Sequence, residues 1–147
     1  MARSSRAWFE YVRQCSVDAE RVRQTIERME AREQPHAQSY QPSVSHGGNA
    51  DAMQATDARI LYEDGQKDKQ KERYAALDRA NAILYGEPGK DGLDKRLDSK
   101  HADVVCFYYC MADTWDEVAR SVGYTESHCR RMATEAFAWM DENGMAV

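Results

Sequence analysis

Seven apolar or small residues recur between positions 8 and 29 at alternating spacings of four and three. This heptad pattern predicts one long helix over residues 5–33, with a narrow apolar seam and a solvated face rich in Arg, Glu and Gln. Because an isolated amphipathic helix is only marginally stable in water, it needs a partner, either another helix of the chain or a second copy. The seam comprises Trp8, Val12, Cys15, Ala19, Val22, Ile26 and Met29.

A second helix, over residues 51–85, is the expected partner within the chain. The Ser-, Pro- and Gly-rich stretch at 34–50 predicts a loop before it, and Asn49 or Asp51 is its expected N-cap. Its charged centre holds Gly65, where we expect a kink, fraying or a break into two helices. The two helices would pair as an antiparallel, coiled-coil-like hairpin, and the seam would also support self-association as a dimer. The apolar anchors of the second helix are Met53, Ile60, Tyr74, Leu77 and Leu84.

Composition and charge narrow the class of protein. A chain of 147 residues suits one domain, or a small domain with an arm, and its mean hydropathy of −0.81 limits the core. The first residues hold no apolar run long enough for a signal peptide or a membrane span, which predicts a cytoplasmic protein with four reduced cysteines. The net charge is −5, and residues 101–147 hold three basic residues against eight acidic ones. The excess of acid therefore lies in the last third.

Residues 86–92, GEPGKDG, predict a turn, and they lack the spacing of a phosphate-binding loop. A short segment at 93–97 and a helix near 100–112 are expected to follow. That helix should be buried, because apolar residues cover much of its surface. These residues are Val104, Val105, Phe107, Tyr108 and Met111.

Two helix-start signals lie close together in the stretch TWDEVARSVGYTESHCRRM, which begins at Thr114. Thr114 and Glu117 match a capping box, Gly123 suits the left-handed end of the first helix, and Thr125 caps the next. The pattern predicts a short helix, a tight turn and a longer helix, the helix-turn-helix arrangement, with the helix at 100–112 as the third helix. Its expected buried positions are Val118, Val122, Tyr124, Cys129 and Met132, and Ala119 is small where the helices approach.

The segment WDEVARSVGYTESHCRRMATEAF resembles the helix-turn-helix of sigma-70 region 4. In layout, the chain also resembles small phage and prophage regulators of the ArpU/RinA type, which join an N-terminal helical hairpin to a closing sigma-like module. The resemblance implies an all-α protein of a bacterial host cell, with a hairpin at 1–86 and a DNA-binding module at 87–147. It further implies control of phage transcription, most naturally of late genes, through promoter DNA. The matching residues are Trp115, Glu117, Val118, Ala119, Val122, Gly123, Thr125, Cys129 and Ala136.

If the helix at 125–140 enters the DNA major groove, its exposed N-terminal face supplies the contacts. Arg130 and Arg131 can make bidentate bonds to phosphate or guanine, and Glu126 can accept from a cytosine amino group. The backbone N–H at Thr125 can meet a phosphate. The predicted DNA-binding set is Thr125, Glu126, Ser127, His128, Arg130, Arg131 and Thr134.

The acidity of the module keeps two further functions open. Non-specific DNA affinity comes mainly from neutralised phosphates, so a module with few cations binds weakly alone and depends on dimerisation or RNA polymerase. One alternative is a phage packaging protein that resembles a terminase small subunit, and the other is a protein-interaction module that binds RNA polymerase. The arginines of the 5–33 helix alternate with acids, which favours a solvated helix face over phosphate contacts. They are Arg3, Arg6, Arg13, Arg21, Arg23, Arg28 and Arg32.

No enzyme, metal site or cofactor is predicted. Cys106 and Cys110 lie four residues apart among apolar neighbours, and with His101, His128 or Cys129 they do not match zinc-finger spacing. His128 and Cys129 are adjacent on one helix and point in different directions, so they do not form a nucleophile–base pair.

Overall fold

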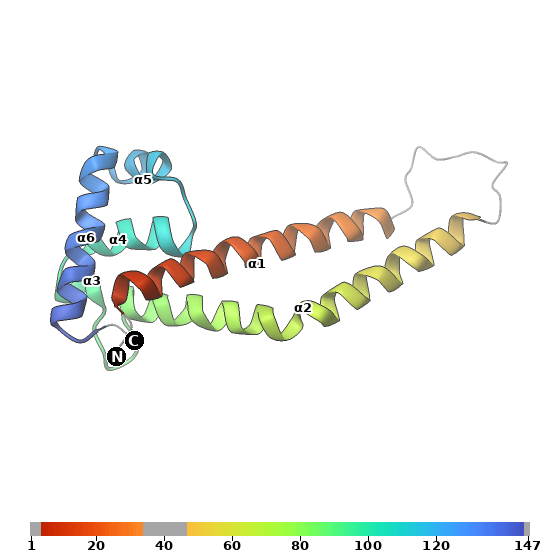
Figure 1. The fold of residues 1–147 in the computed structure, drawn as a ribbon, viewed down its shortest axis with the longest axis horizontal. Coiled ribbons are helices and arrows are strands. Elements are labelled where there is room, and N and C mark those ends of the chain that lie inside the picture. Colours follow the sequence, from red (N-terminus) through yellow and green to blue (C-terminus); the bar gives the residue numbers. More distant parts are fainter. Residues whose placement is uncertain (1–3, 34–46, 146–147) are drawn as a thin grey trace. The chain divides into compact units, whose positions relative to one another are not determined.

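The computed structural model describes residues 4–33 and 47–145, and the fold that these residues form is all-α, as predicted (Figure 1). The chain divides into two compact units. One is built from both ends of the chain, up to Asp18 and from Glu72 onward, and the other is Ala19–Lys71. The elements are α1 (Ser5–Glu33), α2 (Gly47–Tyr85), α3 (Leu93–Arg96), α4 (Ser99–Val105), the π-helix η1 (Cys106–Cys110), α5 (Trp115–Val122) and α6 (Glu126–Glu142).

Helix α1 has the predicted bounds, whereas α2 starts earlier than predicted. It begins at Gly47, so Asn49 and Asp51 lie inside the helix and neither is its N-cap. The prediction was wrong because it treated the two glycines as helix breakers, although glycine costs only about 1 kcal/mol in a helix. The rest of the predicted loop, residues 34–46, lies outside the described residues.

Helix α2 continues through Gly65 as a single helix, so the competing expectation of a break into two helices is wrong. The position is exposed, and a Cβ added there would meet nothing within 4 Å. The penalty for one glycine is small because each residue of a long helix adds a backbone hydrogen bond once the helix has nucleated.

In the unit Ala19–Lys71, two cross-helix contacts join α1 to α2. The Arg59 guanidinium donates to Glu33 at 2.7 Å, and the Gln70 amide donates to the Ala19 carbonyl at 3.3 Å. These pairs place the two segments antiparallel. Ala19 and Val22 are buried between them, while the coiled-coil character remains a prediction.

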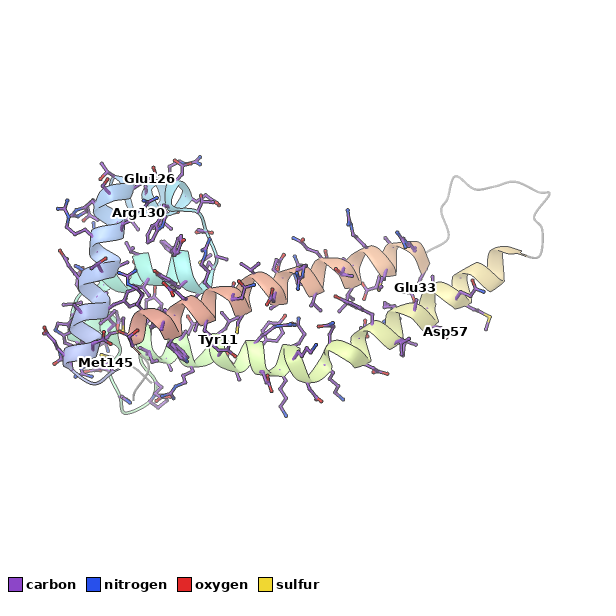
Figure 2. All side chains as sticks on the ribbon, viewed as in Figure 1. Tyr11, Glu33, Asp57, Glu126, Arg130 and Met145 are labelled. Atoms are coloured by element: carbon purple, nitrogen blue, oxygen red, sulfur yellow. The ribbon has the colours of Figure 1, made fainter. Side chains whose placement is uncertain are left out.

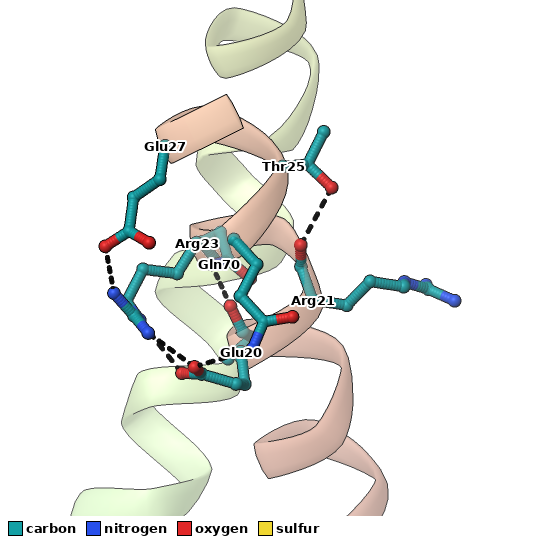
Figure 3. A network of polar contacts seen from close by, with 8 residues as sticks. Glu20, Arg21, Arg23, Thr25, Glu27 and Gln70 are labelled. Atoms are coloured by element: carbon teal, nitrogen blue, oxygen red, sulfur yellow. Dashed lines mark hydrogen bonds and ion pairs between the residues drawn. The ribbon is translucent and has the colours of Figure 1, made fainter. Parts of the chain in front are cut away.

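The exposed side of α1 in this unit carries a local ion-pair network (Figure 3). Arg23 donates to Glu20 at 2.5 Å and also to Glu27, one turn further along the helix. These side chains are about half exposed, and such pairs contribute at most about 1 kcal/mol each. The network therefore supports the helix locally, while the contact with α2 rests on the buried apolar residues and on the hydrogen bonds of Arg59 and Gln70.

The other unit has one apolar core, to which every helix of the chain contributes. Phe9 is fully buried in it, with ring centroids 5.6 Å from Phe137 and 6.2 Å from Tyr109. Although the sequence suggested a boundary near residue 86, the first turns of α1 and the last turns of α2 pack with α3–α6 in this core. Their buried contributions are Trp8, Phe9, Val12, Ala80 and Leu84.

The heptad seam is covered by the chain itself. Trp8 and Val12 belong to the core shared with α3–α6, and Val22 is buried in the other unit. These side chains pack against helices of the same chain, whereas Ile26 and Met29 of the seam are only partly buried. Self-association through the seam stays a prediction.

The segment 86–92 is a turn, as predicted, closed by a backbone bridge between Glu87 and Lys90. Gly92 must lack a side chain for packing reasons, because a Cβ there would lie 2.3 Å from the Gly86 nitrogen. The close approach brings the start of α3 against the end of α2.

The predicted helix near 100–112 begins at Ser99, where the Asp98 side chain caps it, and turns into a π-helix at Cys106. Val104 and Val105 are buried as expected, but Met111 is 58% exposed. Its burial was wrongly predicted because the chain leaves the helix after Cys110, through Ala112 at a positive φ of 59°. Periodicity does not reveal that change of direction.

Helix α1 supplies partners for the carbonyls around this irregular end. Arg13 donates to the Tyr108 carbonyl and, at 2.9 Å, to that of Asp113, and the Ser16 hydroxyl donates to the Cys110 carbonyl at 2.7 Å. A helix end leaves its last carbonyls without partners inside the helix. The π-helix therefore depends on side chains of α1.

Substituting Phe9 with Ala should lower the free energy of unfolding by about 3–5 kcal/mol, because it removes a buried ring from the centre of this core. Tyr11→Ala is the matched control, since Tyr11 is 44% exposed, and it should change stability far less. Urea denaturation followed by circular dichroism measures both. Equal effects would contradict the placement of α1 in this core.

Substituting Gly65 with Ala should stabilise α2 by about 0.5–1 kcal/mol, because alanine loses less backbone entropy in a helix and the site has room for a methyl group. Thermal unfolding of the two proteins measures the difference. A loss of stability would show that the helix is interrupted at this position.

Candidate nucleic-acid interface

The signals that predicted a helix, turn and helix all have their expected geometry. Thr114 accepts from the Glu117 backbone N–H at 3.2 Å, and the Glu117 carboxylate accepts from the Thr114 N–H at 3.1 Å, which completes the capping box. Gly123 ends α5 with a left-handed φ of 80°, a conformation that glycine adopts without strain. Thr125 then caps α6 by accepting from the His128 N–H at 3.1 Å.

Buried apolar residues set the angle between α5 and α6. Val118, Cys129 and Met132 are buried as predicted, and Val122 and Tyr124 pack partly buried against the same core. Helix α4 contributes Val104 and Val105 to that core. Helices α4, α5 and α6 therefore form the three-helix arrangement that the sequence predicted, and α6 is its longest member.

Helix α6 keeps a polar stripe on its outer face. The stripe consists of Ser127, Arg130, Arg131 and Thr134, spaced 3, 1 and 3 residues apart and all exposed. Glu126 is also exposed in the first turn, and Figure 2 shows it with Arg130 at the N-terminal end of α6. The spacing places these side chains on adjoining positions of one helix surface.

Three of the seven predicted contact residues have roles inside the fold. The Thr125 hydroxyl is occupied by its cap, and the His128 ring, partly buried, lies 4.7 Å from the Tyr124 ring. The Thr134 hydroxyl donates to the Arg130 carbonyl and accepts from Arg6. Within the described ranges, the side chains of Glu126, Ser127, Arg130 and Arg131 make no hydrogen bond or ion pair and point to solvent.

A groove of about 510 Å³ lies beside the stripe, and we call it the arginine groove. Helix α1 lines it with Arg6, Glu10 and Arg13, and α6 with Arg130 and Thr134; the rings of Tyr108, Tyr109 and Trp115 complete it. All of these residues belong to one compact unit. Residues far apart in the sequence thus bring three guanidinium groups to one surface.

Aromatic rings position two of the guanidinium groups. The Arg13 guanidinium lies 3.8 Å from the centroid of the Tyr108 ring. Tyr108 in turn stacks on Trp115, with ring centroids 3.9 Å apart and planes 11° apart. The Arg130 guanidinium lies 5.8 Å from the Trp115 centroid. Cation–π contacts of this kind contribute about 0.5–1 kcal/mol at exposed sites. They orient the arginines without neutralising their charge.

Arg6 is fixed by α6. Its guanidinium donates to the Thr134 hydroxyl at 2.8 Å and lies 5.0 Å from the Phe137 ring centroid. Sequence analysis placed Arg6 and Arg13 on a solvated helix face and thereby missed their role in this groove. Their spacing of seven residues shows that they share a helix face, but only the tertiary structure shows that this face meets α6.

His101 links α4 to α6 through two carboxylates. Its ring nitrogens lie 2.8 Å from Asp98 and 2.9 Å from Glu135. Burial disfavours the charged ring, but the hydrogen bonds with Glu135 and Asp98 outweigh it and raise the pKa of His101 above its usual value. The protonated ring, with two N–H donors, is the form that satisfies both carboxylates.

The cysteines do not assemble a metal centre in the described part of the chain, where no group of three His, Cys, Asp or Glu residues is placed to hold an ion. A hydrogen bond with Cys110 lowers the pKa of Cys106 to about 7, against the effect of burial. In the same described ranges, no helix is both long and apolar enough to cross a membrane.

Comparisons with protein-family models, curated proteins and solved structures find no match for this chain.

The His101 bridge should make stability depend on pH. A pKa raised by folding contributes stability that is fully present below the unfolded-state pKa of about 6.5 and is lost as pH rises through the folded-state pKa. The free energy of unfolding of the wild type, relative to that of His101→Gln, should therefore fall as pH rises above 6.5. Urea denaturation of both proteins at pH 6 and at pH 8.5 measures this. If the difference in unfolding free energy between the two proteins is the same at both pH values, the bridge carries no net charge interaction.

Proposed function

We propose that the protein is a DNA-binding transcription regulator that inserts the N-terminal part of α6 into the major groove. The observation that carries the proposal is the capped α5–Gly123–α6 arrangement together with the exposed polar stripe on α6. A helix-turn-helix that reads DNA needs a rigid turn, a supporting helix and an outer helix with donors and acceptors on its exposed side. All three features belong to the same compact unit.

Most acids of the C-terminal third have a hydrogen-bond partner within the fold. Five of the eight serve as caps or hydrogen-bond partners, and two of these, Asp116 and Glu135, face the side chains of Arg120 and His101. Glu126 is the acid nearest the start of the polar stripe. The acids with internal roles are Asp103, Asp116, Glu117, Glu135 and Asp141.

The stripe suits direct readout of base edges. A guanidinium such as that of Arg131 can bind guanine O6 and N7 in bidentate fashion, Ser127 can donate or accept, and Glu126 can accept from a cytosine amino group. The Arg130 guanidinium lies 5.8 Å from the Trp115 ring centroid, beside the same surface. A few base contacts of this kind, set by a rigid turn, provide specificity, while phosphate contacts provide affinity.

The resemblance of this segment to sigma-70 region 4, and of the layout to ArpU/RinA-type regulators, directs the proposal toward phage or prophage promoters and toward late genes. Recognition of RNA polymerase would be compatible with the same module. A packaging protein that resembles a terminase small subunit is the alternative, and it would assemble as a large ring, which native mass spectrometry would detect.

Replacing Arg131 with Ala should weaken binding to the preferred DNA by about 5- to 150-fold, because a bidentate base contact contributes about 1–3 kcal/mol. The preferred fragment is first selected by pull-down of sheared genomic DNA with the full chain. Fluorescence anisotropy then compares wild type, Arg131→Ala and the control Arg120→Ala, an exposed arginine paired with Asp116 on α5. The control should bind as the wild type does.

The outcomes separate the alternatives. If the wild-type protein retains no DNA fragment and instead recovers RNA polymerase, the protein-interaction alternative replaces the proposal. If DNA binds and Arg131→Ala has no effect, Arg131 does not contact a base.

A further inference from the structure

We propose that the arginine groove binds the sugar–phosphate backbone of the DNA strand that flanks the bases contacted by α6. The inference rests on the proposed DNA binding and assigns affinity to residues of α1 that the helix-turn-helix alone does not include. Its ligand is a phosphodiester, and its recognising groups are the guanidiniums of Arg6, Arg13 and Arg130.

The arginines of the groove keep their positive charge. Elsewhere in the described chain, Arg23, Arg59 and Arg120 each pair with a carboxylate on a neighbouring turn or helix. The three arginines of the groove make no such ion pair with any described residue. Their partners are a hydroxyl, backbone carbonyls and aromatic rings, which leave the positive charge in place. The three cations face the carboxylate of Glu10, and Arg13 also lies near that of Asp113, so the groove keeps an excess of positive charge that attracts an anion.

The guanidiniums of Arg6 and Arg13 are held in place by contacts within the fold. Arg13 is held by two carbonyls and the Tyr108 ring, and both hydrogen bonds leave from the same nitrogen, Nη1. Arg6 uses Nη2 for Thr134. A guanidinium has five N–H donors, so both side chains keep donors for a phosphate after these bonds are made. Fixing them in advance reduces the rotamer entropy lost on binding.

The arginine groove lies beside the polar stripe of α6. Arg130 and Thr134 belong to the groove and also to the polar stripe of α6, so the groove runs along one flank of that stripe. A helix inserted in the major groove lies between two sugar–phosphate backbones, about 12 Å apart. A cationic surface beside such a helix meets one of them.

The rings of the groove argue against a stacked base as the ligand. Tyr108 has Trp115 stacked at 3.9 Å and Arg13 over its ring at 3.8 Å. Both groups lie too close to share a face, so neither face of Tyr108 is open to a base. The guanidiniums of Arg6, Arg13 and Arg130 are then the groups that recognise the ligand, and phosphate is an anionic acceptor that suits them.

The test measures DNA affinity of the full chain across a range of salt concentrations. Neutralising one phosphate contributes about −0.9 to the slope of log K against log salt concentration. Replacing Arg6 with Gln should weaken binding to preferred and to unrelated DNA by the same factor. It should also make the slope of log K against log salt concentration less steep, by about the amount that one phosphate contact contributes. Arg23→Gln is the matched control, an α1 arginine with its own carboxylate partners, and it should leave both quantities unchanged.

A second variant excludes misfolding as an explanation. Replacing Glu10 with Gln removes the carboxylate that lines the groove and keeps all three guanidiniums, so it should tighten binding several-fold to every DNA. Damage to the fold would not produce tighter binding.

Each outcome decides between the two proposals. If the wild type binds no DNA, both the proposed function and the groove proposal are overturned. If it binds, and neither Arg6→Gln nor Glu10→Gln changes affinity or salt slope, the groove proposal fails while DNA binding by α6 stands. If both variants change affinity in the expected directions, the groove is the backbone site.

Discussion

The attachment of the first turn of α1 to α6 is the interaction on which the rest of the unit depends. Ser5 is fully buried; its hydroxyl donates to the Phe137 carbonyl at 3.0 Å and to Asp141 at 2.5 Å, and its backbone N–H donates to Asp141 at 2.9 Å. One turn later, Phe9 enters the core against Phe137. This attachment gives the short helices an apolar partner. It also lets Arg13 donate to carbonyls around η1, and it brings Arg6 and Arg13 of α1 to the flank of α6.

The same attachment brings basic residues of α1 beside the acidic C-terminal third. Read as a linear segment, residues 101–147 are too acidic for a surface that binds phosphates. In the folded unit, acids such as Asp141 and Glu135 are hydrogen-bonded within the structure, and Arg6 and Arg13 join Arg130 from the opposite end of the chain. The net charge of a sequence segment differs from the charge of a protein surface, because folding brings side chains that are distant in the sequence onto one surface. We infer that affinity and specificity are divided between α1 and α6.

Local chemistry predicted much of the fold and the outline of the site, whereas tertiary packing decided the rest. The capping signals of Thr114, Gly123 and Thr125 depend on neighbouring residues, so the sequence was sufficient to locate the α5–α6 turn. The exposure of Met111 depends on where the chain leaves the π-helix, which periodicity does not encode. The contact between Arg6 and Thr134 joins residues separated by 128 positions, and no local pattern identifies it.

The central claim is that one surface, formed by α1 and α6 together, contacts DNA. Nuclear magnetic resonance of the arginine side-chain N–H groups, in the full chain titrated with its preferred duplex, tests it most directly. The account predicts that the signals of Arg6, Arg130 and Arg131 shift together, while those of Arg23 and Arg59 stay in place. Shifts of Arg23 and Arg59 with unchanged signals from the groove and the stripe would contradict it.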